Sequence, residues 1–352
     1  MSVTLHDVAL AAGVSIKTVS NVVRGQGSFS PETRSRVEAA IEALGYRPNL
    51  AARGLRSGRL GVIGLVVPDI RNPYFAELAD AVMRAAAAQD LLVVLEQSGG
   101  DPEVELELLR GRRTQMVDGI LFSVLGLAPG NPGLDASITT PVVILGEPIP
   151  DWPTDYVTMR NADGARAATR HLIECGRTRV GAIGALHGQR TGTAALRLAG
   201  YQQALADAGL PYEKSLVRDV GVWSRSAGAA GTRQLLADHD EIDGIVAFND
   251  AMALGAMRVL EETGRRVPQD VAVIGFDDID ETRYSSPTLS TIKPGLEDIA
   301  TTSLDYLMSR IGAKTSPAPR THLAPFDLLV RESSGAAVTT MSRSRSQSSS
   351  RQ

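Results

Sequence analysis

Hydrophobic positions near the start of the chain recur at the spacing of an α-helix. The first run predicts a helix from about Leu5 to Ala12. Thr4, with Asp7 three residues later, can form a capping box at its start, and Gly13 suits a left-handed turn after its end. The residues expected on the inner face of this helix are Val8, Ala9 and Ala12.

The same spacing predicts two further helices. Ser15 can cap a helix from Ile16 to about Val23. Ser30 and Pro31 place a cap and a first-turn proline at the start of a third helix, which extends to about Leu44. The inward positions are expected to be Val19, Val22 and Val23 in the second helix and Val37, Ala40, Ile41 and Leu44 in the third. Two helices joined by a short glycine-containing turn form the layout of a helix-turn-helix.

From Gly61 onward, short runs of β-branched residues alternate with helical patterns. The predicted strands are Gly61–Val67, Leu91–Leu95, Gly119–Ser123, Val142–Leu145, Arg179–Ile183, Gly244–Asn249 and Val271–Phe276. The predicted helices are Pro73–Gln89, Pro102–Met116, Ala162–Cys175, Ala194–Gly209 and Ala251–Gly264. Repeated β-α units predict parallel sheets with helices on both faces, and the length of this region suggests two lobes.

The charge of the chain is distributed unevenly. Residues 1–60 hold eight Lys/Arg and four Asp/Glu, a net +4, whereas residues 61–352 hold 28 basic and 36 acidic residues, a net −8. A basic start on an acidic remainder is typical of a module that meets phosphates. The single cysteine, Cys175, excludes an internal disulfide and fits a reducing cytoplasm. We expect no signal peptide and no membrane span, because no charged leader or run of eighteen apolar residues is present.

The outward positions of the second predicted helix suit DNA. Lys17 can donate to guanine, Asn21 can pair with adenine, and Ile16 can touch a thymine methyl group. The hydroxyl groups suited to phosphate contacts are those of Ser15, Thr18 and Ser20. On this pattern alone, a plain three-helix bundle and a DNA-binding module are equally good interpretations.

Residues 46–58 read as a basic linker with an exposed leucine. Pro48 and Asn49 start a short helical turn that Gly58 can end. Leu55 among arginines fits a wedge between base steps in the minor groove, with Arg53 and Arg56 near the DNA backbone.

Polar and aromatic side chains follow three of the predicted strands. In parallel sheets, ligands bind at the carboxyl ends of strands, so these residues predict a site for a polar, hydroxyl-bearing ligand. Each could instead be a loop or helix-capping residue. They are Asp69, Arg71, Asn72, Tyr74 and Phe75, then Asn249 and Asp250, then Asp277 and Asp278.

Catalytic and metal-binding patterns are lacking. No nucleophile elbow, Walker loop, dinucleotide fingerprint or H-E-x-x-H motif occurs. The five histidines have no metal-ligand spacing, His187 reads as a loop or rim residue, and Cys175 reads as a core thiol. Adjacent Asp277 and Asp278 do not indicate two carboxylates that face one substrate. We therefore expect a protein that is not an enzyme, without metal or cofactor.

The first 59 residues resemble the headpiece and hinge helix of LacI/GalR-type bacterial transcriptional regulators. The matching stretches are V-T-L-H-D-V-A-L-A-A-G-V-S-I-K-T-V-S-N-V-V, S-P-E-T-R-S-R-V-E-A-A-I-E-A-L-G-Y-R-P-N and A-A-R-G-L-R-S-G. The resemblance implies base contacts from Ile16, Lys17 and Asn21 and an intercalating Leu55. Asn21 stands where many members carry arginine. The full set of expected DNA-binding residues is Thr4, Ser15, Ile16, Lys17, Thr18, Ser20, Asn21, Arg24, Asn49, Ala52, Arg53, Leu55 and Arg56.

The remainder resembles the family's two-lobed, periplasmic-binding-protein-like effector domain. The matching stretches are I-R-N-P-Y-F-A-E-L, L-R-L-A-G-Y, F-N-D-A-M-A-L-G-A, V-I-G-F-D-D and L-S-T-I-K-P. The expected effector-binding residues are Asp69, Asn72, Tyr74, Phe75, Asp163, Arg197, Trp223, Asn249 and Asp277. The sequence departs from the family at Gly146-Glu147, Arg160 and Ala195, so an ordinary hexose should not be assumed.

The fold class implied is a small all-α helix-turn-helix head followed by an α/β two-lobed domain. The boundaries expected are a head at 1–46, a hinge at 47–60, an effector domain at 61–333, and a disordered Ser/Arg-rich tail at 334–352. The first lobe is expected at about 61–160 and 292–325, and the second at about 161–291 and 326–333. No leucine-heptad helix ends the chain, so a homodimer is expected.

The function implied is a cytoplasmic repressor. It is expected to bind a pseudo-palindromic double-stranded operator under the control of a small polar, sugar-like effector. A solute-binding protein is the alternative, and a sugar-modifying enzyme is a third hypothesis that no residue pattern supports.

Overall fold

The computed structural model divides the chain into two compact units, Met1–Val62 and Ile63–Gln352, here called the head and the body. The residues that the structure describes are 3–23, 27–46, 59–110, 116–127, 134, 138, 140–149, 152–186, 192–313, 315 and 317–335.

The head contains the three predicted helices, which are α1 (Leu5–Ala12), α2 (Ile16–Val23) and α3 (Pro31–Leu44). The Thr4 hydroxyl accepts from the Asp7 amide and the Asp7 carboxylate accepts from the Thr4 amide, which completes the capping box. Gly13 adopts the left-handed conformation, with φ of 64°. Ser15 Oγ accepts from the Thr18 amide at 3.1 Å and caps α2. The local predictions for the head are therefore confirmed.

One predicted core position of the head is wrong. Leu44 is 37% exposed, whereas Tyr46 is 8% exposed and belongs to the core with Val8, Val19 and Val37. Gly45, at φ of 61°, ends α3, and the Tyr46 amide donates back to the Ile41 carbonyl at 3.0 Å. This reversal turns the tyrosine ring inward, so the last helical leucine is left at the surface.

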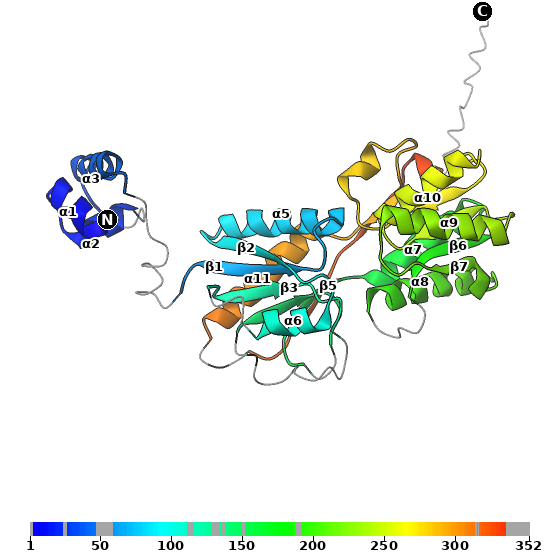
Figure 1. Ribbon diagram of the computed structural model, residues 1–352, viewed down its shortest axis with the longest axis horizontal. Helices are drawn as coiled ribbons and strands as arrows, with labels where there is room; N and C mark the ends of the chain where they lie inside the picture. The colour runs from blue at the N-terminus through cyan, green and yellow to red at the C-terminus, as the bar shows by residue number, and fades with distance from the viewer. Residues whose placement is uncertain are drawn as a thin grey trace, which may run out of the picture. The chain divides into compact units, whose positions relative to one another are not determined.

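The body begins with a six-stranded sheet in the order β11-β5-β4-β3-β1-β2, in which the pairs β11-β5, β5-β4, β4-β3 and β3-β1 are parallel. Its strands are β1 (Val62–Val67), β2 (Leu92–Gln97), β3 (Gly119–Phe122), β4 (Val142–Leu145), β5 (Asp155–Met159) and β11 (Thr321–Ala324). Its helices are α5 (Pro73–Ala87), α6 (Pro102–Leu109) and α11 (Leu296–Ile311). These elements are called the first lobe (Figure 1).

Alternation along β1 explains why helices cover both faces of this sheet. Ile63, Leu65 and Val67 pack into one cluster with α5 and α11. Val66 points the other way, into a cluster that includes Leu108 and Leu109 of α6. A parallel strand buried on both faces reads as a continuous apolar run, as β1 does in the sequence.

The second lobe is a four-stranded parallel sheet in the order β7-β6-β8-β9, covered by four helices. Its strands are β6 (Val180–Ala185), β7 (Val217–Asp219), β8 (Gly244–Ala247) and β9 (Ala272–Ile274). Its helices are α7 (Asn161–Glu174), α8 (Thr193–Asp207), α9 (Arg225–Asp238) and α10 (Asp250–Glu262). Helix α7 packs on α8 and α9 packs on α10. Short 3₁₀ turns occur at Lys214–Leu216, Asp280–Arg283 and Glu332–Ser334.

The chain passes between the lobes at short connections. Strand β5 ends at Met159 in the first sheet, and α7 of the second lobe begins at Asn161. Strands β10 (Thr291–Lys293) and β12 (Asp327–Leu329) pair antiparallel. Between these two strands in sequence lie α11 and β11 of the first lobe. The two-stranded β10-β12 ribbon therefore carries the chain into the first lobe and back.

The structure corrects the extent of one predicted helix. Helix α6 ends at Leu109 instead of continuing to Met116, which lies in a turn. Arg110 already leaves the helical conformation. Several elements were not predicted from the sequence: β5, β7, α9, β10, α11, β11 and β12. Within the described residues, no helix is long and apolar enough to cross a membrane.

Candidate DNA-binding and effector sites

The second helix of the head presents the residues expected to read DNA. Ile16 and Lys17 are exposed and Asn21 is partly exposed, while Val19 and Val22 on the opposite face are buried. Lys17 and Asn21 are one helical turn apart, so both side chains lie on the same face. The capped start of α2 thus offers the exposed polar edge that a recognition helix needs.

The hydroxyl-bearing candidates of the head have partners within it. Ser15 Oγ lies 2.9 Å from Thr18 Oγ1, and Thr4 Oγ1 donates to Asp7 Oδ2 at 2.7 Å. A hydroxyl group can accept while it donates, so these contacts are compatible with phosphate binding. Ser20 is partly exposed on α2. Six predicted DNA-binding residues lie outside the described residues, namely Arg24, Asn49, Ala52, Arg53, Leu55 and Arg56.

In the body, Arg197 of α8 is the centre of a buried polar cluster. Its side chain is 1% exposed, which is rare for arginine and requires several partners. Nε donates to Asn161 Oδ1 at 2.8 Å, and Nη1 donates to the Phe248 carbonyl. The guanidinium carbon lies 3.5 Å from the centroid of the Phe276 ring, a stacking contact.

Asp277 faces this arginine from the end of β9. Its Oδ1 lies 3.6 Å from Arg197 Nη2, and its φ is 122°, a strained backbone conformation for a residue other than glycine. Burial raises the pKa of the Asp277 carboxyl well above its usual range, and the Arg197 charge opposes that shift. Asp278, next in sequence, faces another way and pairs with Arg283 at 2.9 Å and Arg331 at 2.6 Å. The two adjacent carboxylates therefore do not face one site.

Tyr74 of α5 brings the first lobe into the cluster. Its ring packs edge-on against Phe75, with centroids 5.1 Å apart. Burial raises the pKa of the Tyr74 hydroxyl, the nearby Asp277 charge adds to that rise, and the Arg197 charge opposes it. These interactions place Tyr74 close to a carboxylate and a guanidinium of the second lobe.

Trp223 and Asn249 complete the part of the cluster in the second lobe. The Arg197 guanidinium lies 5.3 Å from the centroid of the Trp223 ring, whose Nε1 donates to the Gly184 carbonyl at 2.9 Å. Asn249 Oδ1 caps α10 by accepting from the Met252 amide at 2.8 Å. Its Nδ2 is buried without a hydrogen-bond partner in the described chain. An unsatisfied buried donor of this kind is a place where a ligand oxygen can bind.

Three of the nine expected effector residues have partners close by in the sequence. Asp69 pairs with exposed Arg71, with Oδ2 2.9 Å from Nη2. Asn72 caps α5 by accepting from the Tyr74 amide at 3.2 Å. The side chain of Asp163 is 59% exposed and lies 3.4 Å from Arg160 Nη1. The structure thus brings together Tyr74, Phe75, Arg197, Trp223, Asn249 and Asp277. Of the other three, Asn72 contacts this group through the amides of Tyr74 and Phe75, and the ion-pair partners of Asp69 and Asp163 are arginines outside it.

Comparisons with known proteins agree on one family. Residues 4–49 match the profile described as bacterial regulatory proteins of the lacI family, and residues 169–334 match a periplasmic binding protein-like domain. The chain is 36% identical over 338 residues to the HTH-type transcriptional regulator CelR of Thermobifida fusca, covering 94% of this chain and 98% of the relative. This protein belongs to the LacI family of bacterial regulatory proteins.

Solved structures of LacI-family members share its architecture. A CelR–cellobiose complex superposes with a TM-score of 0.70 at 33% identity, covering 94% of this chain and 99% of that chain. A LacI-family regulator from Sanguibacter keddieii gives 0.73 at 47% identity, covering 78% and 99%. A lac repressor dimer bound to operator and an anti-inducer gives 0.78 at 28% identity, covering 96% and 100%.

Family membership decides two of the expectations drawn from the sequence. The LacI-family protein is a DNA-binding transcriptional regulator with a helix-turn-helix head and an α/β body. The matched families and relatives are regulators and not enzymes, as expected. No group of three or more His, Cys, Asp or Glu that could hold a metal ion lies among the described residues. His187 lies outside them, and Cys175 is only partly buried, with a thiol pKa raised by burial.

Sequence reasoning missed Asn161 as a member of the cluster and noted Glu147 only as a departure from the family. Asn161 is the first residue of α7 and is 3% exposed. Glu147 Oε1 accepts from Asn161 Nδ2 at 2.6 Å and from Thr158 Oγ1 at 2.9 Å. Burial raises the pKa of the Glu147 carboxyl, and these two hydrogen bonds oppose the rise. Glu147, Asn161 and Arg197 therefore form one chain of hydrogen bonds from the first lobe to the second.

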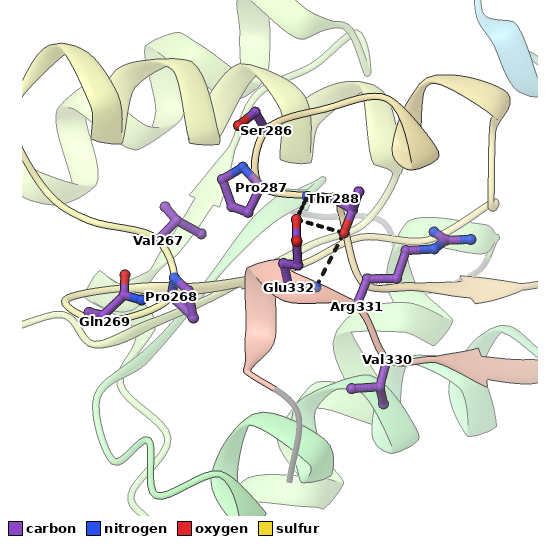
Figure 2. A pocket seen from close by; sticks show the side chains of 9 residues that line it. All are labelled: Val267, Pro268, Gln269, Ser286, Pro287, Thr288, Val330, Arg331 and Glu332. Carbon is purple, nitrogen blue, oxygen red and sulfur yellow. Dashed lines mark hydrogen bonds between the residues drawn. The ribbon is translucent and has the colours of Figure 1, made fainter. Parts of the chain in front are cut away.

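A separate groove of about 750 Å³ lies on the second lobe. It is lined by Val267, Pro268, Gln269, Ser286, Pro287, Thr288, Val330, Arg331 and Glu332 (Figure 2). Glu332 Oε2 accepts from the Thr288 amide at 2.8 Å and from its hydroxyl at 3.0 Å, which ties the end of the described chain to the groove wall. None of the residues predicted to bind DNA or effector lines this groove.

Proposed function

We propose that this regulator is a repressor whose operator binding is controlled by a small polar, sugar-like effector. The observation that carries the proposal is the buried cluster around Arg197, since its members come from both lobes. A ligand that changes these contacts would change how the lobes are held. Ligand binding and operator binding would then be reciprocally coupled, typically by ~1–3 kcal/mol.

The head supports sequence-specific recognition of double-stranded DNA. Ile16, Lys17 and Asn21 would contact base edges in the major groove from the exposed face of α2. Thr4, Ser15, Thr18 and Ser20 would contact phosphates. Leu55, between Arg53 and Arg56 in the linker, would insert in the minor groove at the centre of the operator. Such a regulator acts where the chromosome is, which is the bacterial cytoplasm.

The polar cluster supports a ligand rich in hydroxyl groups. It offers an unpartnered donor on Asn249, carboxylates on Asp277 and Glu147, and the aromatic rings of Tyr74 and Trp223. The matched CelR structure is a complex with cellobiose, which supports a sugar-like effector here. Arg197 is 1% exposed and its donors are held by protein atoms. An effector would therefore reach it only if the lobes separate.

A homodimer would place two heads on a pseudo-palindromic operator. The matched lac repressor structure is a dimer bound to operator, which supports the same assembly here. Strand β2 is an edge of the six-stranded sheet, and its Leu92 and Val94 are 50% and 49% exposed. An exposed apolar edge strand is a ready site for pairing with another chain. We propose that β2 lies in the dimer interface.

Selection from randomised DNA, followed by titration with the selected site, tests the proposal. The wild-type protein should select a two-fold-related sequence, and Lys17→Ala should relax the preference at one base pair in each half. Arg36→Ala removes a positive charge from an exposed position of α3, and as a control it should weaken binding evenly across sequences. Failure to select any sequence above nonspecific binding would refute the proposal.

A further inference from the structure

Glu147 offers a carboxylate oxygen that the protein leaves unused. It follows β4 and Gly146, whose φ of 148° gives the chain a sharp turn there. Oε1 receives both hydrogen bonds of this carboxylate, from Thr158 and from Asn161. Among the described residues, Oε2 has no hydrogen-bond or ion-pair partner. A half-buried carboxylate held rigidly by one oxygen presents the other as a fixed acceptor.

Among the described residues, the surroundings of Glu147 hold more carboxyl groups than cations. Arg197 is the cation that interacts with Glu147, Asp250 and Asp277, and all three carboxylates lie close to it within the described chain. The other charged groups nearby are paired elsewhere, since Asp69 holds Arg71, Asp163 holds Arg160, and Glu77 accepts from the Asp280 amide at 2.8 Å. One buried guanidinium thus faces three carboxyl groups.

This imbalance selects among classes of effector. An anionic ligand, such as a sugar acid, would bring a further negative charge beside these carboxyl groups and be repelled. A neutral sugar could donate hydrogen bonds from its hydroxyl groups but would bring no positive charge to these carboxyl groups. A protonated amine would both donate to Glu147 Oε2 and restore the balance of charge. The orphan Nδ2 of Asn249 needs an acceptor, which a hydroxyl oxygen of the same ligand can supply.

We propose that Glu147 determines effector specificity and that the effector is a polyhydroxylated amine, of the amino-sugar class, whose ammonium group binds Glu147 Oε2. This inference rests on the proposed function, because it concerns the same effector site.

The experiment uses the full chain and matched sugars that differ in charge. The set is D-glucosamine, N-acetyl-D-glucosamine, D-glucose and D-glucuronate, together with the corresponding glucose-based disaccharides. Isothermal titration at neutral pH should show the free-amine member of a set binding at least about tenfold more tightly than the neutral members. The uronic acid should bind most weakly. Glu147→Gln, which keeps an oxygen for Thr158 and Asn161, should abolish the preference for the amine.

Two controls separate a specificity role from a structural one. Glu103→Gln removes an exposed carboxylate of α6 and should leave the preference unchanged. Ligand-free Glu147→Gln protein should melt at the same temperature as wild type or higher, because a partly buried carboxyl whose ionisation is disfavoured by burial is replaced by a neutral amide. A lower melting temperature would make Glu147 a structural residue and overturn the inference.

Three binding results would also overturn it: equal affinity for amine and neutral members, a preference for the acid, or an unchanged preference in Glu147→Gln. Selection from randomised DNA is the companion measurement. If the protein selects an operator but prefers neutral or acidic sugars, this inference fails and the proposed function stands. If it selects no DNA sequence, the proposed function fails.

Discussion

Asn161 Oδ1 accepts a 2.8 Å hydrogen bond from Arg197 Nε. The same amide donates to Glu147 Oε1, so a single side chain at the start of α7 orients a carboxylate of the first lobe and a guanidinium of the second. Both nitrogen and oxygen of the amide are used, which fixes its orientation.

Asn161→Ala should therefore lower the free energy of unfolding by ~1–3 kcal/mol, because it leaves the buried Nε donor of Arg197 without a partner and removes one of the two hydrogen bonds to Glu147 Oε1. Urea unfolding of the full chain measures this loss. In a double-mutant cycle with Glu147→Ala, which removes the acceptor, the two changes should be non-additive by ~0.5–2 kcal/mol, as expected for residues in direct contact. Additive effects would mean that the hydrogen bond contributes nothing to stability.

Asn249→Ser tests the orphan donor on its own. Serine keeps the oxygen that caps α10, so the ligand-free protein should lose less than about 1 kcal/mol of stability. Loss of the unpartnered Nδ2 should weaken effector binding about tenfold, the effect of one hydrogen bond to a buried donor. The measurement is a titration with the sugar that stabilises the wild type most. Undiminished affinity would place the effector away from Asn249.

Much of this architecture could be predicted from sequence because its strands are buried on both faces. Strand β4 matches its predicted bounds, and β1 and α2 match theirs to within a residue. Helix α9 was missed because its sequence contains Gly228 and Gly231, which weaken a helical pattern. In the fold, a Cβ atom at Gly228 would lie 2.3 Å from the Met252 carbonyl oxygen. The glycine that reads as a helix breaker is what allows α9 to pack on α10.

The site was predictable where residues follow strands and not where distant segments meet. Tyr74, Arg197 and Asp277 come together as expected. Nothing local in the sequence signals that Asn161 lies between Glu147 and Arg197, since only the passage of the chain between lobes brings these three together. Asp69 and Asn72 are polar residues that follow a strand, as binding residues often do. In the structure, Asp69 pairs with Arg71 and Asn72 caps α5.

Asp250 should make stability depend on pH. It is fully buried, and burial raises the pKa of its carboxyl to about 7, against the effect of hydrogen bonds from Thr291 and the Ile279 amide. A carboxyl whose pKa is raised by folding stabilises the protein at low pH, and that contribution is lost as pH rises through the folded-state pKa. The decline should therefore run from about pH 4 to about pH 7 or slightly above.

Asp250→Asn isolates this contribution. The difference in unfolding free energy between variant and wild type should shift in favour of the variant by up to roughly 4 kcal/mol between pH 4 and pH 8. Urea unfolding at several pH values measures it, and the subtraction removes the opposite contribution of Asp155, whose pKa is lowered by Arg320 and Arg310 in spite of its burial. A difference independent of pH would mean that Asp250 is ionised throughout.

Val94→Lys tests whether β2 joins two copies of the chain. A lysine on this edge would place a charge in the proposed interface, and a desolvated unpaired charge is costly. Sedimentation equilibrium should show a dimer for wild type and a monomer for the variant at micromolar concentration. Leu125→Lys changes a side chain that is 65% exposed outside any strand, and it should remain dimeric. Dimers of both variants would place the interface elsewhere.

The stability of the head should depend strongly on Tyr46. Tyr46→Ala removes a ring that is 8% exposed from a core that has eight buried residues in the described part of the head, at a cost of ~3 kcal/mol. Because a small domain has little stability in reserve, the head should unfold while the body stays folded. Operator binding should be lost, and limited proteolysis should cut the head but leave residues 63–335 intact.

Leu44→Ala is the matched control, two residues away. Leu44 was expected in the core and is 37% exposed, so its truncation should leave operator affinity and protease resistance close to wild type. The relative size of the two losses shows which side chain belongs to the core. The helical pattern of the sequence predicts Leu44, and the chain reversal at Gly45 predicts Tyr46. If Leu44→Ala were the more damaging change, the helix would have to continue past Gly45 and hold Tyr46 outside the core.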